Sequence, residues 1–280
     1  MSGLEPEGLL PLLQQLLLSQ KQQSDVEGVL SMIKATVDAE CFSSSLPDKE
    51  WATGVATIFA ALRVGMRSSI ATGKWVRDRK GYAMTVHSCC KDLGQGKRAS
   101  FLTRVMTFEA VSSLLTCIVS DMVADSVSLY VLLQATNDLC CIVFCSEEMK
   151  SEFASIKNVG LFGKIVSVCL EIAKNHENDL KCRLMALTSL KTVVDCSKEK
   201  CDSLCVVLPG LASTLANIAC KSSNEHYRII VSSLKVSDYN NDLPVFFRKH
   251  ILLIPFRITY ISYRNIYFKD IVSCHLLLRS

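Results

Sequence analysis

The feature that most constrains this chain is a series of apolar segments with helical spacing, separated by only a few polar residues. Helices of roughly 12–20 residues with short connectors are typical of antiparallel helical hairpins. The sequence therefore predicts an all-α fold. The predicted helices span residues 7–19, 24–40, 48–66, 101–121, 127–145, 159–175, 179–195, 203–219 and 225–236.

The composition agrees with long helices. Of the 280 residues, 49% are hydrophobic, and only 12 are glycine and 6 are proline. An all-β fold needs many tight turns, for which these residues would be too few. Core material for one or two domains, or for a continuous stack of helix pairs, is ample.

Two N-terminal segments show the pattern of one buried helix face. In the first, Ser24 and Glu27 are spaced as a capping box, and in the second Asp48 is placed to cap the helix. Apolar residues recur at helical spacing in both, which predicts buried stripes. These residues are Val26, Val29, Leu30, Ile33 and Val37 in the first segment, and Trp51, Val55, Ile58, Phe59, Leu62 and Met66 in the second.

The segment that begins at Asp179 resembles the second helix of a HEAT repeat. Asp179 stands at the helix start, Arg183 follows one turn later, and Ala186 leaves room for a neighbouring helix. The helices predicted from Val159 and from Ser203 start 44 residues apart, within the ~40–47 residue period of HEAT and armadillo units. An α-α superhelix of four or five such pairs is predicted. Its stripe here would contain Leu180, Leu184, Leu187, Leu190 and Val194.

Most of the positive charge is concentrated between Arg63 and Arg104. This stretch contains ten basic and two acidic residues, so its net charge is +8, whereas the net charge of the whole chain is +4. Within this stretch, residues 67–100 contain four glycines and predict an irregular, partly mobile insert, although 82–93 could form one helix. We expect a partner-binding basic surface formed by Arg63, Arg67, Lys74, Arg77, Arg79 and Lys80.

Two kinds of partner fit this basic segment. Clustered lysine and arginine can bind nucleic-acid phosphates, and Trp75 and Tyr82 could stack on bases. Alternatively, a solvated basic loop could bind an acidic protein. The second interpretation is favoured, because the rest of the chain shows no nucleic-acid-binding motif.

No catalytic, cofactor or metal site is predicted. The stretch Leu93 to Ser100, LGQGKRAS, lacks the first glycine and the Ser or Thr of a phosphate-binding loop. The three cysteines Cys196, Cys201 and Cys205 lack a paired C-x2-C spacing. The pair His87 and Cys90 is explained equally well by an amphipathic helix.

The fourteen cysteines favour a reducing compartment. Many of them fall inside apolar runs, as packing thiols do, and form no regular ladder. The N-terminus carries Glu5 and Glu7 where a secretion signal has basic residues, and no uncharged apolar window of ~18 residues is present. The sequence predicts a soluble protein of the cytoplasm, and also of the nucleus.

A family resemblance is carried by the C-terminal third. The stretches LPGLASTLANI (208–218) and IVSSLKV (230–236) are similar to the N-terminal part of the HEAT-repeat family of Tel-two-interacting protein one, over roughly residues 125–236. This resemblance implies an interaction scaffold of the Triple T complex. Its partners would be the other Triple T subunits, phosphatidylinositol-3-kinase-related kinases and the ninety-kilodalton heat-shock chaperone. A karyopherin-like transport adaptor and a nucleic-acid-binding helical repeat are the alternatives.

The predicted organisation has four parts: N-terminal helical repeats (1–66), the basic insert (67–100), HEAT-type repeats (101–236) and a different tail (237–280). The tail holds eight of the chain's twenty aromatic residues and shows no helical stripe. Lys235-Val236-Ser237 can be encoded by AAG-GTA-AGT, in which GTAAGT is the usual start of an intron. Translated intron and a natural strand-rich extension are the two interpretations of this tail.

Overall fold

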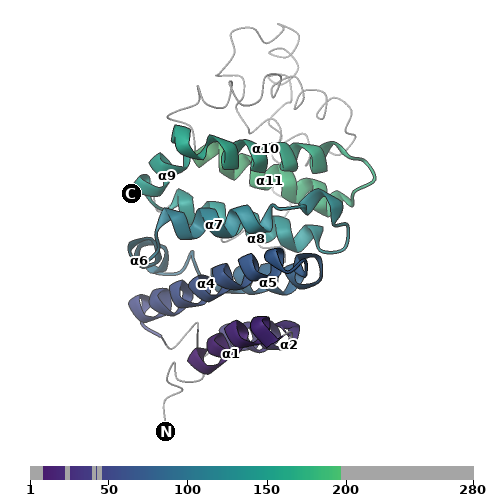
Figure 1. Cartoon of the computed structure of the whole chain (residues 1–280). Helices are drawn as coiled ribbons and strands as arrows, with labels where there is room; N and C mark the ends of the chain where they lie inside the picture. Colours follow the sequence, from purple (N-terminus) through teal and green to yellow (C-terminus); the bar gives the residue numbers. More distant parts are fainter. Residues whose placement is uncertain (1–8, 23–25, 40–41, 43–45, 197–280) are drawn as a thin grey trace, which may run out of the picture.

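The computed structural model describes residues 9–22, 26–39, 42 and 46–196, and these form a stack of helices (Figure 1). The all-α fold predicted from the sequence is confirmed. The helices are α1 (Leu9–Gln22), α2 (Val26–Asp38), α4 (Asp48–Ala71), α5 (Trp75–Cys90), α6 (Arg98–Val105), α7 (Phe108–Ile118), α8 (Leu129–Phe144), α9 (Glu147–Phe153), α10 (Val159–Lys174) and α11 (Leu180–Cys196), with short 3-10 turns η2 (Met122–Ala124) and η3 (Ile156–Asn158).

The helices are arranged as four pairs in two layers. The pairs are α1/α2, α4/α5, α7/α8 and α10/α11. The second helices contact one another in order from α2 through α5 and α8 to α11, and the first helices α1, α4 and α7 do the same. Each pair therefore lies on the previous one, which is the predicted superhelical arrangement (Figure 1).

The repeat is longer than the predicted unit. The second helices start at residues 26, 75, 129 and 180, which are 49, 54 and 51 residues apart. The short helices α6 and α9 lengthen the second and third intervals, because each lies in the connection from one pair to the next, and the first interval contains the 24-residue helix α4. Both lie on the left of Figure 1, which we call the connector edge. The α4–α5, α7–α8 and α10–α11 connections lie on the right, which we call the turn edge.

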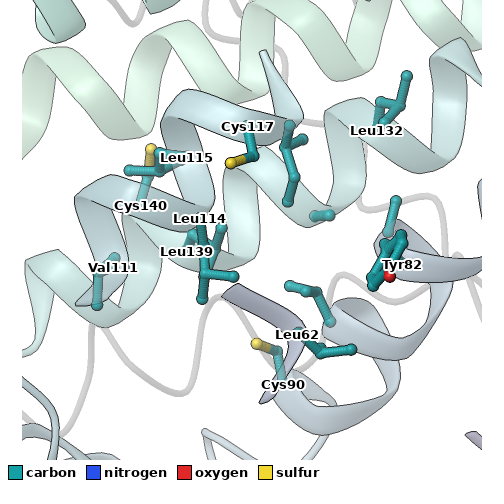
Figure 2. Packing of buried hydrophobic residues seen from close by; sticks show 14 of the residues in the cluster. Leu62, Tyr82, Cys90, Val111, Leu114, Leu115, Cys117, Leu132, Leu139 and Cys140 are labelled. Carbon is teal, nitrogen blue, oxygen red and sulfur yellow. The ribbon is translucent and has the colours of Figure 1, made fainter. Parts of the chain in front are cut away.

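The core lies between the two layers and is formed by the predicted stripes. All five stripe residues of α2 and all six of α4 are buried. Figure 2 shows buried side chains of this core, among them Leu62 of α4, Tyr82 of α5, Leu114 of α7 and Leu139 of α8. Each large apolar side chain buried in this way contributes about 1.5–3 kcal/mol relative to an exposed one.

The segment 101–121, predicted as one helix, is two helices. The break falls at Met106 and Thr107, and the Thr107 side chain caps α7 by accepting a hydrogen bond from the Ala110 N–H at 3.3 Å. Helix α9 was not predicted, and Ser146 caps it in the same way through the Met149 N–H.

Within the described residues no single helix is long and apolar enough to cross a membrane. Two pairs of helices reach that length only together: α6 with α7–η2, which are bent by 95°, and α8 with α9, which are bent by 118°.

Helix α11 confirms most of its prediction. The Asp179 carboxylate accepts a hydrogen bond from the Lys181 N–H at 3.1 Å and so caps the helix. Arg183 Nε donates to the Ala173 carbonyl at 3.2 Å, which holds the end of α10. The predicted stripe is wrong at Leu180, which is 40% exposed in the first turn of α11, and Leu184 is only half-buried. The buried face contains Cys182, Ala186, Leu187, Ser189, Leu190 and Val193.

Several predictions lie outside the described residues. These are the helices at 203–219 and 225–236, the tail at 237–280, the Ser24 capping box and the side chain of Val194. The division of the chain into four parts therefore stays a prediction, apart from the segment 67–100.

Candidate interaction surface

The basic segment 67–100 is part of the helical stack, so the prediction of an irregular insert is wrong. Helix α5 contains 16 of its residues, its two ends belong to α4 and α6, and the buried face of α5 includes Tyr82 and Val86. Gly81 lies inside this helix at a close contact, since a Cβ there would be 3.0 Å from the Leu30 Cδ1 atom of α2. Gly73, with φ +69°, forms the turn before α5. Gly81 thus serves helix packing, and Gly73 and Gly96 serve turns.

Arg79 is a structural residue, which corrects its assignment to the predicted surface. Its side chain is buried and forms an ion pair with the buried Asp125, and it donates to the Asp121 carbonyl at 3.2 Å. Trp75 Nε1 donates to the Ser120 carbonyl at 3.3 Å from the same end of α5. Both contacts fasten α5 to the loop between α7 and α8, so neither side chain is available to a partner.

The other five residues of the predicted basic surface fall into two groups. Arg63 and Arg67 lie on α4 against α7, where Arg67 donates to the Ser113 hydroxyl at 2.6 Å and Arg63 is 4.0 Å from the Glu109 carboxylate. The second group, at the α4–α5 turn, contains the half-buried Lys74 and the exposed Arg77 and Lys80.

The remaining basic residues of the segment lie elsewhere. Lys91 pairs with Asp38 of α2 at 2.5 Å, and Arg98 is buried beside Asp48 and Asp92. The basic residues that are clustered in the sequence are therefore distributed over several parts of the helical stack.

The two aromatic residues proposed to stack on bases are inside the protein. Trp75 is 4% exposed and Tyr82 is fully buried, and their ring centroids are 6.0 Å apart. Base stacking requires an open ring face. This support for nucleic-acid binding is thereby removed.

The glycine-lysine turn near Gly96 binds an anion of the same chain. The Asp48 carboxylate accepts hydrogen bonds from the Lys97 N–H at 3.1 Å and from Arg98 Nε at 3.3 Å. The Arg98 guanidinium also lies 5.2 Å from the ring centroid of Trp51. Asp48 lies in the first turn of α4 and links it to α6, so its predicted role as a cap is wrong. The turn that resembled a phosphate loop is occupied by this carboxylate.

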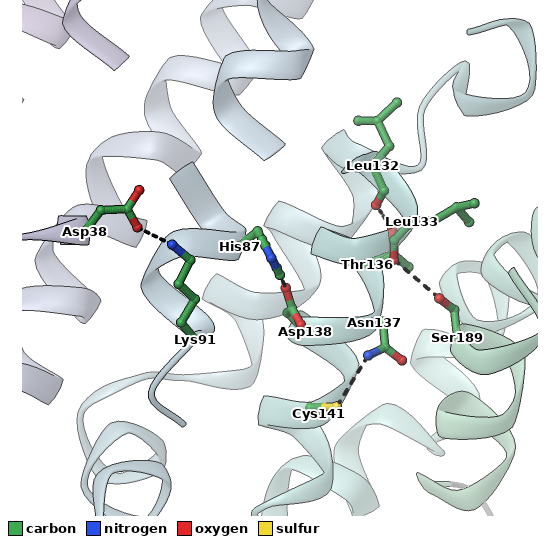
Figure 3. Close-up of polar contacts among 10 residues, drawn as sticks. All are labelled: Asp38, His87, Lys91, Leu132, Leu133, Thr136, Asn137, Asp138, Cys141 and Ser189. Carbon is green, nitrogen blue, oxygen red and sulfur yellow. Dashed lines mark hydrogen bonds and ion pairs between the residues drawn. The ribbon is translucent and has the colours of Figure 1, made fainter. Parts of the chain in front are cut away.

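A row of polar contacts joins successive second helices (Figure 3). In addition to the Asp38–Lys91 pair, Asp138 of α8 lies 2.7 Å from His87 Nδ1 of α5. The α8–α11 contact is made by the hydroxyls of Thr192, which donates to Asn137 Oδ1 at 2.9 Å, and of Ser189, which donates to the Leu133 carbonyl at 3.3 Å. The sequence showed no sign of these contacts, because each joins residues 51–56 positions apart.

Burial and pairing shift the acidity of the two carboxylates in this row. Burial raises the pKa of Asp138, and the nearby His87 opposes that shift. Burial also acts to raise the pKa of Asp38, but hydrogen bonds from Lys34 and Lys91 outweigh it and lower that pKa. Neither carboxylate is left as an open acidic surface.

Most cysteines among the described residues have the environment of packing thiols, but Cys141 is half-buried and Cys145 is exposed. Burial raises the pKa of the Cys90 thiol well above its ordinary value and that of Cys169 to about 12, which disfavours the nucleophilic thiolate. The partner of His87 is Asp138, so the histidine is engaged away from the predicted Cys90 pair. Within the described part of the chain no group of three metal-binding side chains is present. Cys201, Cys205 and the side chain of Cys196 lie outside it.

The layers, edges and inter-repeat contacts define a helical-repeat protein, a class whose working parts are the surfaces of a stack. The family model described as the TTI1 N-terminal TPR domain matches residues 97–239, which is more than half of the chain. The chain therefore belongs to this family. No curated protein and no solved structure matches it.

This match confirms and extends the resemblance found in the sequence. It starts at the beginning of α6, earlier than the predicted residue 125, and ends at residue 239, close to Ser237. The family description names TPR repeats, whereas the sequence suggested HEAT or armadillo units. All three are stacked antiparallel helix pairs, and the observed spacings of 49–54 residues exceed the ~34 residues of TPR and the ~40–47 of HEAT.

Proposed function

We propose that this chain is a protein–protein interaction scaffold of the Triple T complex. In that role it would support the folding, stability and assembly of phosphatidylinositol-3-kinase-related kinases, together with heat-shock chaperones. The observation that carries this proposal is the family match over residues 97–239, which includes the helices α6 to α11. We place this activity in the cytoplasm and also in the nucleus.

The structure offers no specific support for the two alternative functions. A nucleic-acid-binding repeat needs a continuous basic stripe, but Arg79 and Arg98 are buried and Lys91 is paired. A karyopherin-like carrier needs an acidic groove, but Asp38 and Asp138 of the second-helix layer are paired with Lys91 and His87.

Co-elution with recombinant Triple T subunits in size-exclusion chromatography tests the proposal. The folded chain should elute in their complex. Leu187→Asp, which places an unpaired charge in the core of α11, should abolish both folding and co-elution. The exposed Leu10→Asp of α1 is the control and should preserve both. A wild-type chain that is folded by circular dichroism yet elutes apart from all the subunits would contradict the proposal.

A further inference from the structure

Exposed apolar residues recur at one position of the repeat. Val76, Tyr130 and Leu180 lie at the starts of the second helices α5, α8 and α11, and they are 67%, 38% and 40% exposed. Because α5 contacts α8 and α8 contacts α11, these positions follow one another along the turn edge. Val123 and Val127, in the loop between α7 and α8, are also exposed, by 42% and 83% of their surface. We call these five residues the turn-edge row.

The loop that contains Val123 and Val127 is held in place by the buried Asp125. The Asp125 carboxylate accepts hydrogen bonds from the N–H groups of Val127 and Ser128, both at 2.9 Å. The same carboxylate is paired with the buried Arg79. The loop is held by these polar contacts and by the buried Met122, whereas Val127 is exposed, so the fold gains almost nothing from an aliphatic side chain at Val127. Adjacent exposed apolar residues of this kind are typical of a protein-binding surface.

The charges around the row indicate the chemistry of the partner. Lys74, Arg77 and Lys80 lie around Val76 at the α5 end, where Asp121 is the exposed carboxylate of the neighbouring loop. Arg77 is paired with the Asp78 carboxylate at 2.6 Å, so Lys74 and Lys80 supply the positive charge of this end. At the α11 end the exposed charges are mixed: they include Glu177, Asp179 and Lys181. The row is therefore apolar along its length and positive at one end.

We propose that the turn-edge row docks an acidic amphipathic segment of a partner protein. The apolar side of the segment would cover Val76, Val127 and Tyr130, and its carboxylates would lie near Lys74 and Lys80. Three stacked helices span about 20 Å at packing distances of 8–10 Å, which a helix of about 13 residues covers. A nucleic acid would gain little from the valines of this row. The inference rests on the proposed scaffold function and assigns it a surface.

Fluorescence anisotropy with labelled 16-residue peptides tests this docking. The probe is an amphipathic helix with leucines on one face and glutamates on the other, and a lysine version of the same peptide is its control. The wild-type chain should bind the glutamate peptide at least tenfold more tightly than the lysine peptide. Val76→Glu combined with Val127→Glu should weaken that binding at least tenfold, as should Lys80→Glu. These exposed substitutions leave the core intact.

Matched controls separate the row from other exposed residues. Val64→Glu combined with Val105→Glu changes two valines of 51% and 45% exposure that lie outside the row, and Lys164→Glu changes an exposed lysine of α10. None of these should alter peptide binding more than twofold. Equal loss in the controls, or equal binding of the two peptides, would overturn the inference. Co-elution with Triple T subunits would then still stand as the test of the scaffold function itself.

Two further outcomes identify a different occupant. If sedimentation shows a dimer of the chain that Val76→Glu with Val127→Glu dissociates, the row binds a second copy and the inference fails. If labelled single-stranded RNA binds the wild type and Lys80→Glu abolishes that binding while the glutamate peptide does not compete, the edge is a nucleic-acid site. A monomer with no such RNA binding supports the docking of an acidic segment.

Discussion

The two edges of the stack each bury one arginine of the same basic segment, but they do so differently. At the turn edge, Arg79 reaches from α5 to the next repeat and pairs with Asp125; the two side chains are only 5% and 6% exposed. At the connector edge, Arg98 reaches back to Asp48 and Asp92, whose side chains are 34% and 18% exposed. One contact is sealed from water and the other is partly hydrated.

This difference has an energetic consequence. Removing one member of a sealed pair leaves an uncompensated charge in a low-dielectric site, which costs about 3–5 kcal/mol. A carboxylate that water can reach recovers part of its hydration when its partner is lost. The turn edge should therefore be the more vulnerable of the two, although both arginines are buried.

The largest effect is expected at the turn edge. Arg79→Met should lower the free energy of unfolding by about 3–5 kcal/mol, because Asp125 is left buried without its cation. Urea denaturation followed by circular dichroism measures this. The neighbouring exposed residue provides the control, and Lys80→Met should change the same free energy by under about 0.5 kcal/mol. Similar values for the two variants would remove the distinction between the edges.

A double substitution separates the cost of the orphaned charge from the value of the pair. Arg79→Met with Asp125→Leu removes both charges and should be less destabilising than Arg79→Met alone, by about 1–3 kcal/mol. Asp125 also caps the backbone of Val127 and Ser128, so the recovery should be incomplete. The same denaturation experiment shows it. A double variant that is simply the sum of the two singles would mean that the pair is not coupled.

A smaller loss is expected at the connector edge. Arg98→Met should cost about 1–2 kcal/mol, since Asp48 keeps the Lys97 N–H and contact with solvent, while the packing over Trp51 is partly retained by the methionine. The test is the ratio of the two losses in one denaturation series. Arg98→Met matching or exceeding Arg79→Met would reverse the comparison.

The smallest effect concerns His87–Asp138, which joins the same two repeats as Arg79 with less burial. Burial raises the folded-state pKa of Asp138 above its unfolded value near 3.8. The stability that this carboxyl contributes is therefore fully present below about pH 4 and lost as pH rises through the folded pKa. Asparagine does not titrate, so Asp138→Asn should gain stability relative to wild type between pH 4 and pH 7, by about 1 kcal/mol or less.

Thermal melts of both proteins across this pH range give the difference directly. The lowered pKa of Asp38 acts in the opposite direction, since its contribution is lost only as pH falls through its folded pKa, below 3.8. The two windows do not overlap. A stability difference that stays constant or falls from pH 4 to pH 7 would contradict the assignment for Asp138.

The sequence was most informative where a pattern is local. The stripes of α2 and α4 were predicted residue by residue, because a one-sided helix repeats its apolar positions every three or four residues. The break between α6 and α7 also carried a local sign, Thr107, which is a strong cap followed by Glu109 in the first turn. That sign was hidden by the apolar residues on both sides of it.

The candidate site could be predicted much less well. Arg77, Arg79 and Lys80 look alike in sequence, and their difference arises from the loop at 119–128, which brings Asp125 to Arg79 alone. The role of Gly81 depends in the same way on Leu30, fifty-one residues earlier. A contact between residues that are far apart in the sequence produces no periodic pattern in either segment, so it could not be predicted.

Amide hydrogen exchange is the sharpest test of whether the basic segment 67–100 is an integral part of the helical stack. Amides of α5 between Tyr82 and Cys90 should exchange as slowly as those of α8 between Leu132 and Ile142, because both helices lie in the same buried layer. The turn at 91–97 should exchange much faster and serves as the internal reference. Exchange of α5 at the rate of that turn would contradict the claim and restore the interpretation of residues 67–100 as a mobile insert.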